Sequence, residues 1–288
     1  MHSESLARTV PVECGTHKIA VDIYGRAGDP AVVLVHGIPG WRGTWREVAA
    51  SLCDRAEVFV PDLVGFGESS PAPHRFHAAD QARVLADLLR RLGRSRVHLA
   101  GFDFGGPTSV MLTSIVPQWI ASLTLAATNV LTDTPVPLPL QLVRPPVIGD
   151  VFARLFFGRL GLSMMWRAAV MRRERFGFGD FQDALRFPQT ITSTRQIFQA
   201  SLRDLRGLYR PVEAALPRIE VPCTVLWAEH DPFFPLSVGE RTAERIPGAS
   251  FEVSRGCGHF LPKEDPTAIA RAIGRMCEES ITGRSLTR

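Results

Sequence analysis

Short apolar runs alternate with longer amphipathic segments along most of the chain, and this alternation limits the possible folds more than any other feature. The runs expected to form buried strands are 32–35, 57–61, 97–100, 123–126, 223–227 and 250–253. The segments expected to form helices are 43–53, 76–92, 106–116, 237–245 and 265–279. This order predicts a mostly parallel central sheet with helices on both faces, which binds ligands beyond the carboxyl ends of its strands.

The alternation stops between about Asn129 and Pro211. A proline-rich stretch, with prolines at 135, 137, 139, 145 and 146, leads into helical, aromatic-rich sequence without a buried strand. We interpret residues 131–211 as a helical cap, inserted into an α/β core that comprises residues 1–130 and 212–288.

Composition excludes several classes of protein. With 288 residues and 45% hydrophobic content, the chain can bury a large core. No apolar stretch is long enough for a membrane span, and the N-terminus lacks the basic start and apolar run of a secretory signal, so we expect a cytoplasmic protein. The five cysteines are scattered and lack CxxC spacing. This pattern predicts free thiols, with neither a disulfide framework nor a zinc site.

The net charge of +4 comes mostly from arginines that are spread along the chain. The one mild cluster contains Arg172, Arg173 and Arg175 and is interpreted as a solvated helix face. A nucleic-acid partner is not expected, because nucleic-acid-binding proteins gather such charge into a stripe.

The strongest functional signal is the segment Gly101-Phe102-Asp103-Phe104-Gly105-Gly106. It lies between a predicted strand and a predicted helix, as a Gly-x-nucleophile-x-Gly elbow does. Such a tight turn raises one side chain above the sheet and needs small neighbours. That side chain is Asp103, which is therefore the candidate nucleophile.

A carboxylate nucleophile performs chemistry different from that of a serine. It is already ionised, so it needs no base for activation. It attacks a saturated carbon and forms an alkyl ester of the enzyme, which an activated water must then hydrolyse. His259, in Gly-Cys-Gly-His-Phe after the last strand, is the candidate base for that water. Asp231 is the candidate carboxylate that orients His259, and Glu229 is the weaker alternative.

Hydrolysis of the ester also needs donors for the developing oxyanion. The backbone N–H groups of Ile38, in His36-Gly-Ile-Pro-Gly, and of Phe104 are the candidates.

Together these motifs carry a family resemblance. The chain resembles α/β-hydrolase-fold enzymes with an aspartate nucleophile, namely epoxide hydrolases, haloalkane dehalogenases and haloacetate dehalogenases. The resemblance covers nearly the whole chain outside the cap. It rests on HGIPG at 36–40, DLVGFGES at 62–69, the elbow GFDFGG, the segment WAEHDPFFP and GCGHF. It implies a pocket lined by His36, Pro39, Trp166 and Phe260, with His36 also serving the structure of the loop.

The resemblance separates three chemistries. Haloalkane dehalogenases place a halide-binding tryptophan directly after the nucleophile, and often an asparagine in the HGNP loop. Here these positions hold Phe104 and Ile38, so Trp166 or another cap residue would have to replace them. Haloacetate dehalogenases place arginines at and after the elbow, where this chain has Phe104, Pro107 and neighbouring hydroxyl residues.

Epoxide hydrolases use cap tyrosines to donate a proton to the epoxide oxygen. Tyr209, in Gly-Leu-Tyr-Arg near the end of the cap, occupies the matching place of the second such tyrosine. The only other tyrosine is Tyr24 in the N-terminal strand region, so the first cap tyrosine is missing.

The sequence thus predicts hydrolysis of a small epoxide or related electrophile to a diol. Asp103 attacks, Tyr209 assists the oxygen, and His259 with Asp231 activates water, without a metal or organic cofactor. Dehalogenation and, more distantly, a non-catalytic binding protein of the same fold are the alternatives. A homodimer is left open.

Overall fold

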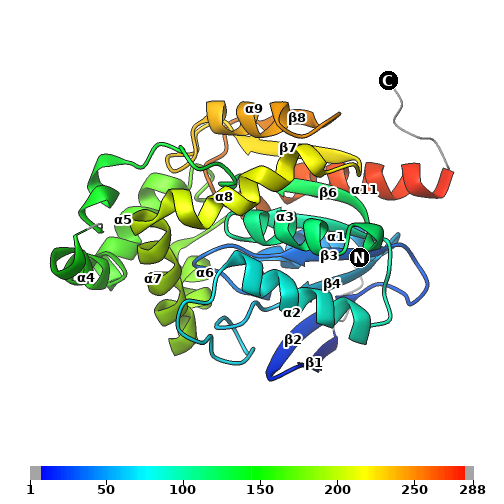
Figure 1. Ribbon diagram of the computed structural model, residues 1–288, viewed down its shortest axis with the longest axis horizontal. Coiled ribbons are helices and arrows are strands. Elements are labelled where there is room, and N and C mark those ends of the chain that lie inside the picture. Colours follow the sequence, from blue (N-terminus) through cyan, green and yellow to red (C-terminus); the bar gives the residue numbers. More distant parts are fainter. Residues whose placement is uncertain (1–7, 144, 283–288) are drawn as a thin grey trace.

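A computed structural model describes residues 8–143 and 145–282, which form an eight-stranded mixed sheet, helices on both of its faces and a group of helices beyond one end (Figure 1). The strand order is β1-β2-β4-β3-β5-β6-β7-β8. Strand β2 is antiparallel to both of its neighbours, and all other pairs are parallel. The predicted mostly parallel α/β fold is confirmed.

The strands are β1 Arg8–Cys14, β2 His17–Tyr24, β3 Ala31–Val35, β4 Glu57–Pro61, β5 Val97–Phe102, β6 Ile120–Ala126, β7 Cys223–Ala228 and β8 Ser250–Ser254. The α-helices are α1 Arg46–Leu52, α2 Ala78–Arg91, α3 Gly105–Ile115, α4 Pro146–Phe156, α5 Arg159–Ala169, α6 Phe178–Asp183, α7 Pro188–Arg203, α8 Leu205–Ala215, α9 Leu236–Glu244, α10 Leu261–Glu264 and α11 Pro266–Thr282. Short 3-10 helices are η1 Arg42–Trp45, η2 Pro117–Trp119, η3 Leu138–Val143, η4 Ala184–Arg186 and η5 Leu216–Arg218.

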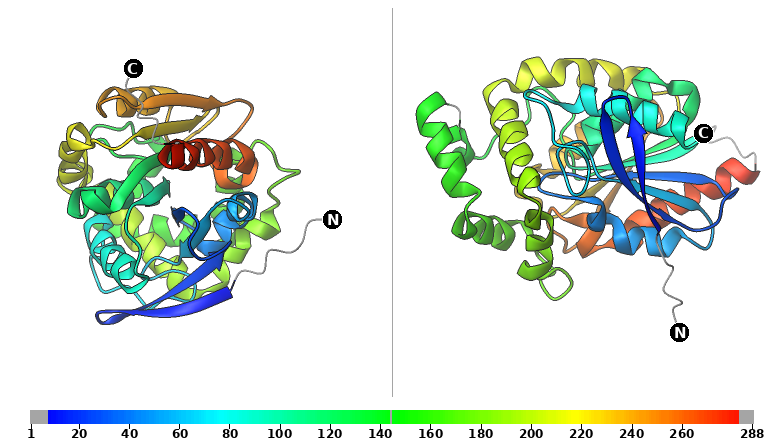
Figure 2. Two further views of the ribbon diagram at one scale, coloured as in Figure 1. Left: turned by 90° about the vertical axis from the view of Figure 1, so that its right-hand side faces the viewer. Right: turned by 90° about the horizontal axis from the view of Figure 1, so that it is seen from below.

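The six predicted strands are present as β3 to β8, and β4 coincides with its predicted range. The hairpin of β1 and β2 is absent from the predictions because neither strand is a continuous apolar run. Its outer strand alternates between exposed and partly buried side chains along most of its length, which suits an edge strand with one face in water (Figure 2).

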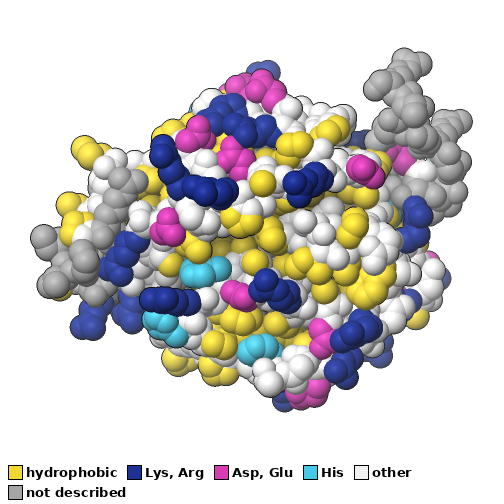
Figure 3. Space-filling view, in the orientation of Figure 1, with side chains coloured by type: hydrophobic (Ala, Val, Ile, Leu, Met, Phe, Trp, Pro, Cys, Tyr) yellow, Lys and Arg dark blue, Asp and Glu magenta, His cyan; other side chains and the backbone are white. Residues whose placement is uncertain are grey.

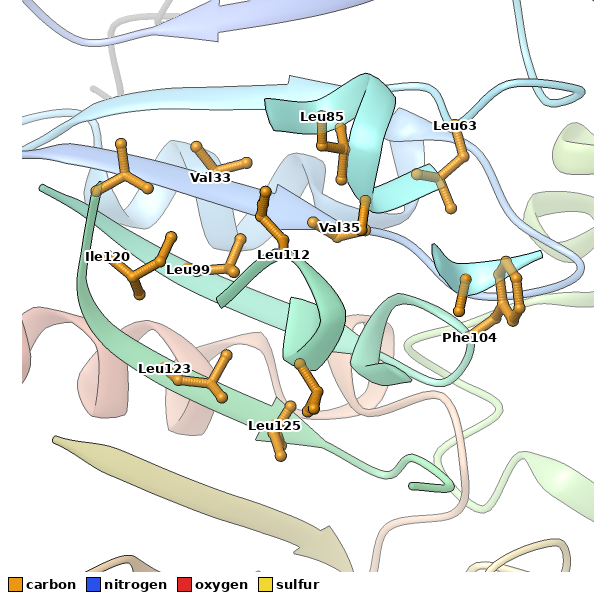
Figure 4. Close-up of a cluster of buried hydrophobic side chains, with 14 of the residues drawn as sticks. Val33, Val35, Leu63, Leu85, Leu99, Phe104, Leu112, Ile120, Leu123 and Leu125 are labelled. Atoms are coloured by element: carbon orange, nitrogen blue, oxygen red, sulfur yellow. The ribbon is translucent and has the colours of Figure 1, made fainter. Parts of the chain in front are cut away.

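Alternate side chains of the central strands point into two separate cores. In β3, Val33 and Val35 belong to the core beneath α2 and α3, whereas Val32 and Leu34 belong to the core beneath α1 and α11. Figure 4 shows the first of these cores, in which Val33 and Val35 lie near Leu112 of α3. Because helices cover both faces of the sheet, the central strands are continuous apolar runs in the sequence. This pattern made them predictable.

The chain between β6 and β7 forms the helical insertion, with η3, η4 and helices α4 to α8. Helix α8 continues to Ala215 and contains Pro211, so the predicted cap boundary at 211 falls inside a helix. The outermost parts of the predicted core ranges, residues 1–7 and 283–288, lie outside the described residues.

Within the described part of the chain, no helix combines the length and apolar character needed to cross a bilayer.

Candidate active site

Asp103 occupies a strained turn between β5 and α3. Its φ of +51° lies in the left-handed region, which residues other than glycine rarely adopt. Three hydrogen bonds hold this conformation. The Asp103 N–H donates to the carbonyl of Ala126 at 3.2 Å, and the Asp103 carbonyl accepts from the Gly106 N–H at 3.0 Å and from Thr128 Oγ1 at 2.5 Å. Strain of this kind is found at functional sites, where the surrounding structure enforces it.

Two glycines allow the elbow to sit close to the neighbouring strand. A Cβ at Gly37 would lie 2.4 Å from Cβ of Asp103, and a Cβ at Gly105 would lie 2.1 Å from the Val35 carbonyl oxygen. These distances are too short for any side chain. The glycines of the HGIPG and GFDFGG motifs therefore let the two loops meet.

The two carboxylate oxygens of Asp103 have different environments. Oδ1 accepts a 2.6 Å hydrogen bond from the backbone N–H of Ile38, the first predicted oxyanion donor. Oδ2 lies 3.6 Å from Nε2 of His259. Phe104 directly follows Asp103 at the start of α3, and its N–H stays a predicted second donor. One oxygen is thus fixed by the backbone, while the other faces the histidine.

His259 and Asp231 are brought together from two loops at the carboxyl ends of β8 and β7. Nδ1 of His259 lies 2.8 Å from Oδ2 of Asp231. The other oxygen, Oδ1, accepts from the backbone N–H groups of Phe233 and Phe234 at 2.8 and 3.0 Å. Glu229, the alternative partner, instead accepts from the Gly256 N–H at 2.8 Å. Asp231, and not Glu229, is therefore the hydrogen-bond partner of His259.

His259 is enclosed by aromatic rings and placed between two carboxylates. Phe102, Phe233 and Phe260 have ring centroids 5.0–5.1 Å from that of the imidazole, and the residue is 2% exposed. Burial by itself lowers the pKa of His259, but the charges and hydrogen bonds of Asp231 and Asp103 outweigh it and raise this pKa to about 10. The imidazole is thus protonated near neutral pH.

Buried Glu264 joins the histidine loop to the cap. Its Oε2 accepts from the N–H groups of Gly258, Met171 and Arg172 at 2.8–3.0 Å. Next to this contact, the His259 N–H donates to the carbonyl of Ala169 at 2.8 Å. The loop that carries His259 is therefore fixed to the cap as well as to the sheet.

A cavity of about 120 Å³ lies between the cap and the carboxyl ends of the strands, and it contains Asp103 and His259 in its wall. Most of the wall is apolar, with Phe157, Met165 and Phe198 from the cap and Phe233 and Phe234 from the core. The described wall contains no lysine or arginine. A substrate carboxylate would therefore meet only the His259 imidazolium, which is already paired with Asp231 and Asp103.

Tyr209 of α8 lies in the same wall. Burial raises the pKa of its phenol to about 12, while hydrogen bonds with Ser201 and Asn129 act in the opposite direction. The Oδ1 atom of Asn129 already accepts from the Leu131 N–H at 3.0 Å and from Thr134 Oγ1. This arrangement leaves the amide N–H₂ of Asn129 to face Tyr209, because an oxygen-side contact would compete with those two donors.

Two of the four predicted pocket residues line the cavity and two do not. Pro39 and Phe260 line the cavity, but His36 and Trp166 do not belong to its described wall. The His36 ring is fully buried, with Nδ1 2.9 Å from the Gly37 carbonyl oxygen and Nε2 accepting from the Leu63 N–H at 3.0 Å. The Trp166 indole N–H donates to the carbonyl of Phe176 at 3.1 Å. Both side chains therefore serve local structure.

Sequence reasoning missed Asn129 and Ser201, which supply polar groups beside Tyr209. Asn129 follows β6 closely, at the sheet edge where ligands bind, and that position was an available signal. Ser201 lies on α7 and reaches the cavity only through the packing of α7 against α8. No sequence pattern marks it.

Among the described residues, no group of three or more His, Cys, Asp or Glu side chains could hold a metal ion. All five cysteines are free, as their spacing predicts.

Comparison with known proteins identifies the family. The profile of the alpha/beta hydrolase fold matches residues 30–266, and the chain belongs to this family. A curated relative is the 2-hydroxy-6-oxononadienedioate/2-hydroxy-6-oxononatrienedioate hydrolase of a Pseudomonas species. It is 26% identical over 249 residues, which are 82% of this chain and 84% of the relative.

Solved structures agree with this fold. The haloalkane dehalogenase DbeA from Bradyrhizobium elkani has a TM-score of 0.80 and 17% identity, and the match covers 96% of this chain and 99% of that one. The epoxide hydrolase CorEH has a TM-score of 0.79 and 18% identity, and the match covers 96% of this chain and all of the other. At such identities the similarity establishes the fold alone, and together with the family it indicates a hydrolase.

Proposed function

We propose that the protein hydrolyses a small, uncharged, largely apolar epoxide to a diol through an alkyl ester on Asp103. The observation that carries the proposal is the asymmetric setting of the Asp103 carboxylate. Oδ1 is held by the Ile38 N–H, while Oδ2 is directed toward His259 and the cavity. A carboxylate held in this way presents one oxygen for attack and keeps the other in the site where the later oxyanion develops.

In the first step, Oδ2 of Asp103 attacks an epoxide carbon and the bond from that carbon to the ring oxygen breaks. The ring oxygen takes the proton of the Tyr209 hydroxyl. A phenol whose pKa is raised to about 12 keeps its proton near neutral pH and gives it up only to a strong base, such as the developing alkoxide. Ser201 and Asn129 then stabilise the phenolate by hydrogen bonds, and these contacts take the place of the missing first cap tyrosine.

Alkylation also prepares the second step. The ester has no charge, so one of the two carboxylates that raise the pKa of His259 is neutralised. The imidazolium can then pass its proton, through solvent, to the Tyr209 phenolate and act as a base. Held by Asp231, it takes a proton from water, which attacks the ester carbonyl carbon, and Oδ1 becomes the oxyanion beside the Ile38 N–H. As this intermediate collapses, the bond from the carbonyl carbon to the ester oxygen breaks and that oxygen takes the proton from His259, which releases the diol. The Asp103 carboxyl then returns a proton to His259 and is again a carboxylate.

The contents of the cavity support an epoxide over the alternatives. A departing halide needs N–H donors, but the indole N–H of Trp166, which would have to replace the missing ones, already donates to the Phe176 carbonyl. Haloacids carry a carboxylate, and so does the dioate named for the Pseudomonas relative, whereas the described cavity wall has no lysine or arginine and its His259 is already paired with two carboxylates. Hydroxyl donors, which can protonate an epoxide oxygen, are present instead at Tyr209 and Ser201.

The volume of the cavity limits the size of the substrate. Apolar cavities of about 150 Å³ hold a molecule the size of benzene. A cavity of about 120 Å³ therefore fits the reactive end of a short-chain or monoaryl epoxide.

The deciding experiment is intact-protein and peptide mass spectrometry of His259→Gln incubated with panels of epoxides and haloalkanes. Alkylation by an epoxide adds the full mass of the substrate to Asp103, whereas a haloalkane adds its mass less that of the hydrogen halide. We expect epoxide adducts that are absent from Asp103→Asn. Haloalkane adducts without epoxide adducts would assign dehalogenation. Tight binding of the panel without any adduct or wild-type turnover would favour a binding protein.

A single turnover of excess wild-type enzyme in heavy-oxygen water tests the ester independently. The diol of the first turnover should carry no label, because its new oxygen comes from Asp103, and the label should remain on Asp103. Label in that first diol would refute the two-step scheme.

A further inference from the structure

The outer face of the cap carries a concentration of exposed hydrophobic side chains. The six most exposed large hydrophobic residues in the described chain all lie there, at 50–82% exposure. They are Leu138, Leu142, Val151, Leu155, Leu160 and Met164. Hydrophobic side chains exposed singly need no explanation, but a contiguous group of this kind marks an interaction site.

These six residues form one surface, the cap patch. They occur as three pairs spaced four residues apart, one each on η3, α4 and α5. On the α-helices α4 and α5, side chains at this spacing share a helix face. Helix α4 packs against both η3 and α5, so the three pairs are neighbours. Residues of the same region, including Leu140, Phe157 and Met165, point inward and line the catalytic cavity. The cap patch is thus the solvent face of the cavity wall.

The sequence that carries the cap patch is rich in arginine. From position 138 to position 173 the sequence contains six arginines and one acidic residue, Asp150. Among them, Arg154, Arg159 and Arg167 are exposed on α4 and α5. In Figure 3, yellow side chains project from the cap end of the molecule with dark blue ones beside them.

We propose that the cap patch docks the protein on the surface of an anionic lipid bilayer. Helices that lie in a membrane interface combine exposed large apolar side chains with flanking basic residues, and both features are present here. Docking is peripheral, because no described helix could span the bilayer.

Charge argues against a second copy of this chain as the occupant. Two copies that met through the cap patch would bring their arginine-rich segments together with a single acidic residue, Asp150, on each, and like charges across an interface are unfavourable. An anionic lipid surface complements this charge and accepts the leucine and methionine side chains between its headgroups.

Docking itself does not depend on the proposed function. If both hold, the cavity wall lies directly above the bilayer, and the enzyme receives epoxides that partition into lipid.

Cosedimentation of the full chain with vesicles tests the proposal. The vesicles contain phosphatidylcholine with or without 30% phosphatidylserine, a fraction chosen as roughly that of an anionic leaflet. We expect binding to the anionic vesicles that weakens with added salt. Replacement of Arg154, Arg159 and Arg167 by Gln should weaken binding roughly hundredfold, since each basic residue near such a surface contributes about a factor of five. Replacement of Leu155, Leu160 and Met164 by Ser should weaken it by roughly tenfold or more.

Matched controls carry the same changes elsewhere on the surface. Ile115→Ser/Val253→Ser alters two residues that are each 40% exposed outside the cap. Arg218→Gln/Arg255→Gln/Arg271→Gln removes three exposed arginines of the core. Both controls should retain binding, apart from a small uniform loss in the arginine control from the lower net charge. All variants should keep the wild-type thermal midpoint, because the altered side chains are exposed.

Several outcomes would overturn the proposal. No binding to anionic vesicles is one, and equal binding to neutral vesicles is another. Losses of the same size in the controls would show that general surface charge is responsible. A dimer in light scattering that the Leu155/Leu160/Met164 variant dissociates, without vesicle binding by the wild type, would assign the cap patch to self-association.

Discussion

Replacement of Asp231 by Asn should separate the two chemical steps of the proposed reaction. An aspartate offers two acceptor oxygens, and here one accepts from the N–H groups of Phe233 and Phe234 while the other binds Nδ1 of His259. Asparagine offers only one oxygen. Turning it toward His259 would leave two backbone donors without their partner, at a cost of about 1 kcal/mol or more for each. The oxygen should therefore stay with the backbone.

The amide N–H₂ then faces Nδ1 of His259 and forces that nitrogen to be the acceptor. The imidazole proton moves to Nε2, the atom that lies 3.6 Å from Asp103. A histidine protonated at Nε2 cannot take a proton from the attacking water. Losing the correct tautomer in this way costs about 10⁴ in rate in a comparable triad, equivalent to roughly 5 kcal/mol. We expect hydrolysis of the ester to slow by about 10³ to 10⁴, with little change in alkylation.

Rapid-quench mass spectrometry measures both steps, as the rise and decay of the Asp103 adduct. Glu229→Gln is the matched control, since Glu229 binds the Gly256 N–H and not His259. It should leave the decay rate near that of the wild type. The reasoning fails if Asp231→Asn hydrolyses the adduct within about tenfold of the wild-type rate, or if Glu229→Gln slows hydrolysis equally.

Three further predictions concern other parts of the site. Tyr209→Phe should slow adduct formation by about 10² or more, because general-acid assistance is lost, while adduct hydrolysis changes little; equal slowing of both steps would contradict its role. Between pH 6.5 and 10, the unfolding free energy of the wild type should fall relative to His259→Gln in urea titrations. The raised pKa of His259 stabilises the fold fully below about 6.5 and not above about 10, and a difference that stays constant or grows would refute this. Glu264→Leu should lower the unfolding free energy by roughly 3 kcal/mol or more, because three backbone donors lose their acceptor; a thermal midpoint equal to the wild type would count against that account.

The sequence by itself determined the fold class and the residue types at the ends of the strands. Buried parallel strands must be apolar on both faces, so β3 to β8 appear as continuous runs. The elbow needs glycines at fixed offsets, so Asp103 could be recognised from local pattern alone. The edge hairpin of β1 and β2 obeys neither rule and was missed.

Only the tertiary structure decided which side chains meet in the cavity. Asp231 and Glu229 lie two residues apart in one segment. The path of the loop after β7 places Asp231 beside the imidazole of His259 and Glu229 beside the N–H of Gly256. The family resemblance implies that Trp166 lines the pocket, but the fold of the cap turns its indole toward Phe176. Ser201 reaches Tyr209 from a separate helix. Such contacts depend on how distant segments pack, and the spacing of residues along the chain carries no record of that packing.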